Sequence, residues 1–287
     1  MQAYDRYEFE IRNEQLNKYN GNAKDVIIPQ GVTKIGYDAF AGCNSISSVI
    51  IPDGVTAIGF SAFKGCANLE EVRIPSTVKT ISDEAFRNCS ALFSAELPDG
   101  LTSIGRWAFS GCTRLNKVVV PKSVTAIWFS AFSGCTALES ISLPDGLKLI
   151  DDELFMNCTA LKSITLPQAV TSVGNRAFKG CTLLCELALP DGVTSLGEGA
   201  FRDCKSLTSF ILPAGLVNIG RWAFAGCGVK EITIPKSVAC IAMCAFTDCG
   251  ATINCERKKP LFGLPKKWDK TWLGGGQNVK VNWGRKK

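Results

Sequence analysis

Residues 52–74 read PDGVTAIGFSAFKGCANLEEVRI, and stretches of this form recur along most of the chain. The prolines reveal the period, because from Pro29 to Pro213 one follows another every 23 residues, and the last step, to Pro235, is 22. A period of roughly 20–50 residues is typical of proteins whose repeats stack on one another. The 287 residues are therefore predicted to form one repeat solenoid rather than two globular domains.

The apolar residues of one unit indicate which parts of each coil are buried. They are Val55, Ile58, Ala62, Phe63, Cys66, Leu69, Val72 and Ile74. Residues 69–74 predict a strand, because Val72 and Ile74 alternate with polar residues and the next proline ends the ladder. Residues 55–58 predict a second, brief strand, and residues 62–66 a single helical turn. No unit can bury its apolar side alone, so the units are expected to stack.

This pattern resembles the BspA-like leucine-rich repeats, whose units read Leu-x-x-Ile-x-Leu-Pro and then Ile-Gly-x-x-Ala-Phe-x-x-Cys. The resemblance implies an α/β to mainly-β solenoid: a right-handed leucine-rich-repeat superhelix with a parallel sheet on its concave face, and short strands and helical turns on the others. It also implies a capping hairpin at 1–28, ten repeats of 22–23 residues at 29–251, and a closing strand with a basic, Trp-containing cap and tail at 252–287. These parts are expected to form one continuous domain.

The residue inventory argues against an enzyme. The chain has no histidine, which excludes His general bases, Ser–His and Cys–His pairs, and His metal ligands. It also lacks G-x-S-x-G and G-x-x-x-x-G-K-[ST], and no G-x-G-x-x-G follows a strand. We therefore predict no catalytic residue, no cofactor and no metal.

Ten of the fourteen cysteines occupy a single position of the repeat. They are Cys43, Cys66, Cys89, Cys112, Cys135, Cys158, Cys181, Cys204, Cys227 and Cys249. Each thiol is expected to point into its coil as a small apolar filler that bonds weakly to loop backbone. Equivalent side chains on stacked coils run parallel, so disulfides between them are not expected. The sequence therefore predicts a ladder of reduced, buried thiols.

Cys240, Cys244, Cys249 and Cys255 form a local cluster, and four thiolates suit a structural zinc site. Their spacings are not those of paired C-x-x-C knuckles, however, and Cys249 already belongs to the ladder. The alternative interpretation, which we favour, gives these thiols structural roles, with Cys255 in the core of the last coil. Cys185 falls at an exposed strand position and is predicted to be a lone surface thiol.

Two positions of each unit vary inside the constant Ile-Gly-x-x-Ala-Phe frame, and several of them carry aromatic residues or arginine. The resulting candidates for partner contact are Tyr37, Phe60, Arg106, Trp107, Phe129, Arg221 and Trp222, with Trp128, which stands where six other units place glycine. Exposed aromatic and arginine side chains on a rigid scaffold are typical of binding hot spots. The alternative is that they pack on the outer wall of the neighbouring coil, because scattered surface aromatics are ordinary.

The outward positions of the predicted long strands form a second candidate surface, because concave solenoid faces are the usual binding sites. The candidate residues there are Glu70, Glu71, Arg73, Phe93, Glu96 and Lys117. This face mixes both charges with small and β-branched residues, and selects no ligand class.

The net charge of +6 is concentrated at one end of the chain. Residues 256–287 contain ten Lys or Arg and two acids, a local charge of +8, and residues 1–255 sum to −2. With Trp268, Trp272 and Trp283 interleaved, this segment is an alternative functional site that would bind nucleic acid or an anionic surface. The interpretation that we favour is a cap whose tryptophans cover the last open coil while its lysines keep that end soluble.

Together these features predict a non-enzymatic binding scaffold for a protein or glycan, of the kind used in adhesion or host interaction. Nucleic acid is not expected as a partner, and a monomer is favoured. Residues 1–20 carry no apolar run typical of a signal peptide, and no stretch of about eighteen apolar residues occurs. With reduced thiols this favours a cytoplasmic protein, whereas the family resemblance allows a cell-surface or secreted one.

Overall fold

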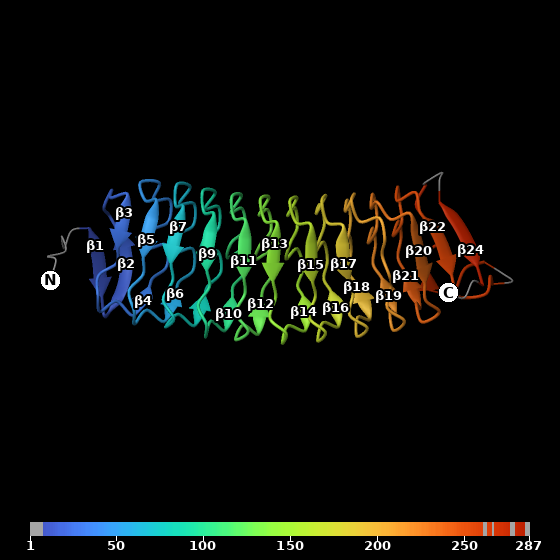
Figure 1. Cartoon of the computed structure of the whole chain (residues 1–287), viewed down its shortest axis with the longest axis horizontal. Coiled ribbons are helices and arrows are strands. Elements are labelled where there is room, and N and C mark those ends of the chain that lie inside the picture. The colour runs from blue at the N-terminus through green and yellow to red at the C-terminus, as the bar shows by residue number, and fades with distance from the viewer. Residues whose placement is uncertain (1–7, 261–262, 266, 276–278, 285–287) are drawn as a thin grey trace. The chain divides into compact units, whose positions relative to one another are not determined.

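The computed structural model describes residues 8–260, 263–265, 267–275 and 279–284. Contacts divide the chain into two compact units, Met1–Pro144 and Asp145–Lys287, called unit 1 and unit 2 below. Each unit is a mainly-β solenoid in which nearly every repeat forms one coil with a long and a short strand (Figure 1). The described residues contain no helix, and none of them therefore forms a helix able to span a membrane. The predicted parallel-stranded solenoid is confirmed.

In the described part of unit 1 the first element is a hairpin, in which β1 (Phe9–Arg12) pairs antiparallel with β2 (Gln15–Tyr19). The hairpin continues into a seven-stranded sheet through the parallel short strands β4 (Lys34–Ile35), β6 (Ala57–Ile58), β8 (Thr80–Ile81), β10 (Ser103–Ile104) and β12 (Ala126–Ile127). The long strands form one unbroken six-stranded sheet, made of β3 (Asp25–Ile27), β5 (Ser48–Ile50), β7 (Glu71–Arg73), β9 (Ser94–Glu96), β11 (Lys117–Val119) and β13 (Ser140–Ser142).

Unit 2 repeats the short-strand sheet but not the continuous long-strand sheet. Its six short strands are β14 (Leu149–Ile150), β16 (Ser172–Val173), β18 (Ser195–Leu196), β19 (Asn218–Ile219), β21 (Cys240–Ile241) and β23 (Lys267–Trp268). Its long strands split into a pair, β15 (Ser163–Thr165) with β17 (Glu186–Ala188), and a triplet, β20 (Glu231–Ile234), β22 (Thr252–Cys255) and β24 (Lys280–Trp283). The coil between β17 and β20 contributes only an isolated bridge, from Ser209 to Glu231.

The long strands form where the alternation predicted them. In β7, Val72 is buried between the exposed side chains of Glu71 and Arg73. Stacking places Val72 opposite Val49 of one neighbouring coil and Ala95 of the other. Each 23-residue step therefore moves the chain by one strand along the parallel sheet, a spacing of about 4.8 Å.

The segment around the Ala-Phe step differs from the expected helical turn. The N–H groups of Ala62 and Cys66 donate to carbonyls three residues earlier, at 3.2 and 3.1 Å. Between them Ser61 has a φ of 53°, and the N–H of Phe63 donates to the carbonyl of Ala85 in the next coil at 2.7 Å. A helix needs negative φ throughout and keeps its N–H bonds within the segment. The prediction of a helical turn is therefore wrong, and successive tight turns occupy this place.

Two positions of each coil adopt left-handed backbone. The one before Ala-Phe does so at Asp38, Ser61, Glu84, Trp107, Ser130, Glu153, Arg176, Gly199, Trp222 and Cys244. The one before the ladder cysteine does so at Gly42, Gly65, Asn88, Gly111, Gly134, Asn157, Gly180, Asp203, Gly226 and Asp248. Gly, Asn and Asp adopt this conformation most readily, which explains why the second position holds only these three. At the first position, hydrogen bonds to the next coil hold even tryptophan in it.

The core of each unit consists of columns of equivalent side chains. Phe63 and Phe86 stack with ring centroids 5.1 Å apart, and Phe201 and Phe224 repeat the contact in unit 2 at 5.6 Å. All four rings are fully buried. Burying one such ring contributes about 1.5–3 kcal/mol to stability, so the column is a main source of cohesion between coils.

The C-terminal segment closes unit 2 as a cap. Trp268 and Trp272 are 5% and 2% exposed, and Trp272 packs edge-on against the last phenylalanine of the column, Phe246, at 5.7 Å. The indole Nε1–H of Trp268 donates to the carbonyl of Val238 at 3.4 Å. These contacts bury the two indole rings against Phe246 and the coil that carries Val238.

Candidate functional site

The exposed aromatic side chains of unit 1 gather on the tight turns. We call Tyr37, Phe60, Trp107, Trp128 and Phe129 the turn ridge. Tyr37 is 65% exposed, Trp128 47% and Phe60 38%, whereas Trp107 and Phe129 are half-buried. The neighbouring candidate Arg106 is exposed, and its backbone N–H donates to Asp83 Oδ1 at 2.7 Å. The structure therefore presents part of the predicted set to solvent on one line of turns.

The rings of the turn ridge also pack on one another between coils. Tyr37 and Phe60 stack with centroids 5.1 Å apart and 5° between their planes. Trp107 meets Phe129 edge-on at 4.9 Å, and Arg87 lies 5.6 Å from the Trp107 centroid. The half-buried rings of Trp107 and Phe129 therefore pack on the neighbouring coil, as the alternative interpretation has it. Tyr37 and Trp128 remain largely exposed to solvent.

A group of ion-paired residues lies next to Trp107 of the turn ridge. Glu84 accepts from Lys64 at 2.7 Å and from Arg87 at 3.1 Å. Partial burial tends to raise the pKa of Glu84, but hydrogen bonds and charge from the two cations outweigh it and lower that pKa. The carboxylate stays ionised at neutral pH and fixes Arg87, the residue that lies over Trp107.

The turns of unit 2 carry a polar ladder in place of the aromatic ridge. Arg176 pairs with Glu153 at 3.1 Å and Glu198 at 3.2 Å. Arg221 and Trp222, the two candidate contact residues in unit 2, are half-buried. The guanidinium carbon of Arg221 lies 3.7 Å from the Trp222 ring centroid. This close stacking occupies the ring face that a partner would use, so Trp222 is less available than Tyr37 or Trp128.

The strand-face candidates of unit 1 are all exposed: Glu71, Arg73, Glu96 and Lys117 lie on the long strands, and Glu70 and Phe93 lie just before them. Phe93, 44% exposed, and Lys117 line a shallow depression of about 580 Å³ together with Arg114 and Asn116. Arg114 was not predicted, because it precedes the strand and its outward direction follows from the turn. The depression joins an aromatic face to two cations.

The predicted thiol ladder is present. None of the fourteen cysteines forms a disulfide, and most ladder thiols donate to carbonyls of neighbouring coils, as in Cys66 Sγ to Phe40 O at 3.0 Å. Burial raises the pKa of Cys112 and of Cys227 to about 12. These thiols therefore stay protonated at neutral pH and serve as core filler.

The other cysteines do not assemble into one site. Cys240 and Cys244 are half-buried, Cys249 stands in the ladder, and Cys255 is buried in β22. No group of three potential metal ligands occurs in the part of the chain that the structure describes. Cys185 is exposed, as predicted.

The basic C-terminal segment offers little for base stacking. Two of its three tryptophans, Trp268 and Trp272, are buried in the cap, and Trp283 packs on Trp268 at 5.7 Å. Lys258, Lys259, Lys267, Lys270 and Lys280 are exposed, whereas Lys266 and residues 285–287 lie outside the described residues. Among the described residues, association with an anionic partner would therefore rest on these exposed lysines and the half-buried Arg257 rather than on base stacking.

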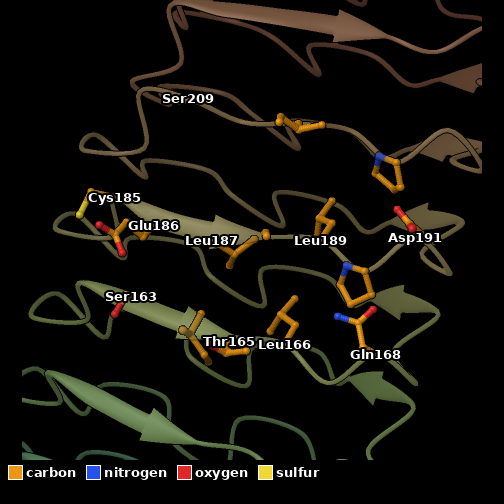
Figure 2. Close-up of a pocket in the computed structure, with 15 residues that line it drawn as sticks. Ser163, Thr165, Leu166, Gln168, Cys185, Glu186, Leu187, Leu189, Asp191 and Ser209 are labelled. Carbon is orange, nitrogen blue, oxygen red and sulfur yellow. The ribbon is translucent and has the colours of Figure 1, made fainter.

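A pocket of about 650 Å³ lies on the strand side of unit 2, and sequence reasoning did not anticipate it. Three successive coils line it, and Figure 2 shows Leu187 and Leu189 of the middle coil between Thr165 and Leu166 of one coil and Ser209 of the next. Its lining also includes Glu186 and Asp191. The signal that could have revealed it is Phe210, the one bulky ring at an inward strand position where other repeats hold smaller residues.

Comparison with known proteins agrees with the fold. The family model described as BspA type leucine rich repeat region (6 copies) matches residues 10–139 and 126–252. A leucine-rich repeat protein from Bacteroides ovatus ATCC 8483 is 30% identical with a TM-score of 0.78, and the match covers 94% of this chain and 71% of that one. The T. pallidum leucine-rich repeat protein is 29% identical with a TM-score of 0.54, covering 72% and 91%.

A leucine-rich repeat protein from Eubacterium ventriosum ATCC 27560 shares the fold at 20% identity and a TM-score of 0.58, covering 95% of this chain and 89% of that one. A search of curated proteins found none that matches the chain. The family model spans well over half of the residues, and it follows the repeat read from the prolines. The chain belongs to the BspA-type leucine-rich repeat family.

Proposed function

We propose that the chain is a non-enzymatic scaffold that binds a protein or glycan partner, with the turn ridge of unit 1 as the main contact. The observation that carries this proposal is the exposure of Tyr37 and Trp128, 65% and 47%, on one line of turns. Large aromatic side chains contribute most of the binding energy of many interfaces. Their flat faces also offer apolar area to a sugar ring or a protein loop.

The backbone under the ridge supports the proposal because it is already ordered. The N–H groups of Asp38 and Trp107 donate to the carbonyls of Phe60 and Phe129 in the next coil, at 3.1 and 3.0 Å. Stacking of Tyr37 on Phe60 also restricts the ring rotamers. A surface ordered before binding loses less conformational entropy when a partner docks.

The residue chemistry supports binding rather than catalysis. The chain contains no histidine, and the buried ladder thiols, with a pKa of about 12 at Cys112, are poor nucleophiles at neutral pH. The charged strand face of unit 1, with Glu71 and Lys117, would orient the partner rather than supply most of the affinity.

The test uses a glycan array and a panel of purified extracellular and cytosolic proteins, followed by affinity measurement of each hit. The double variant Tyr37→Ala/Trp128→Ala should weaken binding by at least about tenfold, the size of a hot-spot loss. Leu183→Ala is the matched control, because Leu183 is a similarly exposed large apolar residue, 48% exposed, that belongs to unit 2 and not to the ridge. It should change affinity by less than about twofold.

Charge reversal on the strand face, Glu71→Lys with Lys117→Glu, separates the two surfaces. We expect it to slow association and to alter the salt dependence, with a smaller loss of affinity than the ridge variant. Unchanged affinity in the ridge variant, for every hit, would contradict the proposed contact.

A further inference from the structure

The strand face of unit 2 is interrupted at Ser209–Pro213, which we call the displaced rung. In neighbouring coils a backbone N–H just before the long strand donates to the previous coil, as from Cys185 to Lys162 at 2.9 Å and from Lys230 to Thr208 at 3.2 Å. Thr208 N–H makes no such bond to Cys185, and β17 pairs only with β15 in the described part of the chain. One edge of β17 is therefore left without a strand partner.

The size of one side chain is the main cause of the displacement. Phe210 stands at the inward strand position, which Val72 and Ile164 fill in regular coils, and its ring packs between Phe201 and Phe224 at 4.9 and 5.4 Å. A ring is too large for a site built for Val or Ile, so the backbone moves outward. Leu187, the inward residue of β17, consequently becomes half-buried, whereas its equivalents in the other three-residue long strands are buried.

The opening exposes main-chain groups that are normally paired inside a sheet. The Cys185 carbonyl receives no hydrogen bond from the Thr208 N–H, and Glu186–Ala188 of β17 line the pocket of about 650 Å³ (Figure 2). An unpaired strand edge is a template for another extended chain, because its N–H and C=O groups recur at the strand period. The half-buried side chain of Leu187 and the side chain of Ile211, which is 65% exposed, flank this edge.

The charge around the opening is of one sign. Glu186 and Asp191 line the pocket, and Asp191 also lines a second one of about 480 Å³ on the other side of the displaced rung, with Glu231 and Glu256. Neither Glu186 nor Asp191 forms an ion pair within the described residues, and no lysine or arginine lines either pocket. Glu231 accepts from Asn254 Nδ2 at 2.5 Å, and Glu256 from the Lys236 backbone N–H at 3.2 Å.

We propose that this opening binds an extended basic peptide segment of a partner protein. The peptide backbone pairs with the free edge of β17, its apolar side chains contact Leu187 and Ile211, and its cations face Glu186 and Asp191. The site is separate from the turn ridge and adds a strand-pairing mode to the scaffold.

The binding test uses the full chain and a fluorescent heptapeptide, Lys-Val-Lys-Val-Lys-Val-Lys, followed by anisotropy. Its control is Lys-Pro-Lys-Pro-Lys-Pro-Lys, which has the same charge but cannot join a strand ladder, because proline lacks the N–H. We expect the valine peptide to bind at least about tenfold more tightly, a difference typical of specific over purely electrostatic contact. Equal affinity of the two peptides, or no binding below about 1 mM, would overturn the proposal.

Two variants locate the site. Asp191→Lys should weaken binding of the valine peptide about tenfold, whereas Asp99→Lys, the equivalent exposed position after proline in unit 1, should leave it within about twofold. Phe210→Val should close the opening and abolish binding while the protein still unfolds cooperatively. Equal loss in both aspartate variants, or full binding by a folded Phe210→Val protein, would place the peptide elsewhere and overturn the proposal.

Discussion

The long-strand sheets of the two units differ although both are built from the same repeat. In unit 1 six long strands pair without interruption, from β3 to β13. In unit 2 the corresponding strands form a pair and a triplet, separated by the displaced rung. The short-strand sheet of unit 2 shows no such break, since β18 and β19 pair in register across the same coils. The interruption is therefore confined to the long-strand side of the coil.

Two residues mark the cause of this difference. Phe210 is larger than the residues that fill its position in unit 1, Val49, Val72 and Ala95 among them. The next coil is one residue short, and a Cβ at Gly228 would lie 1.9 Å from the Lys205 carbonyl oxygen. Side-chain volume and coil length must both agree with the period for the backbone ladder to close. The repeat period by itself is sufficient for the turns and the short strands to form.

Core truncation should show the largest contrast between the units. Phe86→Ala, within the stacked column of unit 1, should lower the free energy of unfolding by about 3–5 kcal/mol, because a cavity replaces a fully buried ring. Phe210→Val should lower it by less than half as much, since the displaced rung can move inward and regain backbone bonds. Urea titration at neutral pH measures both, and equal losses would mean that Phe210 sits in an unstrained site.

Alkaline pH should affect the two units alike, because buried ladder thiols also occur in the coils next to the displaced rung. The pKa of Cys112 in unit 1 and of Cys227 in unit 2 is raised by burial to about 12, from an ordinary value near 9. A folded-state pKa above the unfolded one means that stability is full below about pH 9 and is lost as pH rises toward 12.

Melting temperatures at pH 7 and pH 11 check this expectation. The melting temperature should be lower at pH 11 than at pH 7. Cys112→Ala and Cys227→Ala should each make this difference smaller, by a similar amount. If only Cys112→Ala reduced the difference in melting temperature, the disturbance at the displaced rung would extend into the core of unit 2.

Most of the fold follows from the spacing of particular residues. The recurrence of Val72 and Ile74 before proline predicts the long strands, and the columns of Phe63 and Cys66 predict the stacked core. The helical turn was predicted wrongly because Ala62–Cys66 is compatible with one, and only the hydrogen bond from Phe63 to the next coil excludes it. Such a bond joins residues 22 positions apart, which local propensity does not register.

The candidate site was less predictable for a similar reason. The aromatic turns were identified from variation within the frame, but stacking of Arg221 on Trp222 depends on rotamers that the pattern does not contain. The opening beside β17 was missed because Phe210 is an apolar residue at an apolar position. Periodicity records hydrophobicity and not volume, so the misfit becomes visible only when the coils are stacked.

The claim that Phe210 opens the sheet is tested most directly by amide hydrogen exchange at Thr208. The account predicts rapid exchange at Thr208 in the native protein and at least about tenfold slower exchange in Phe210→Val, because the bond to Cys185 then forms. The equivalent amides of Cys185 and Lys230 should exchange slowly in both proteins, since both are bonded to the previous coil. Slow exchange at Thr208 in the native protein, matching that of Cys185, would contradict the account.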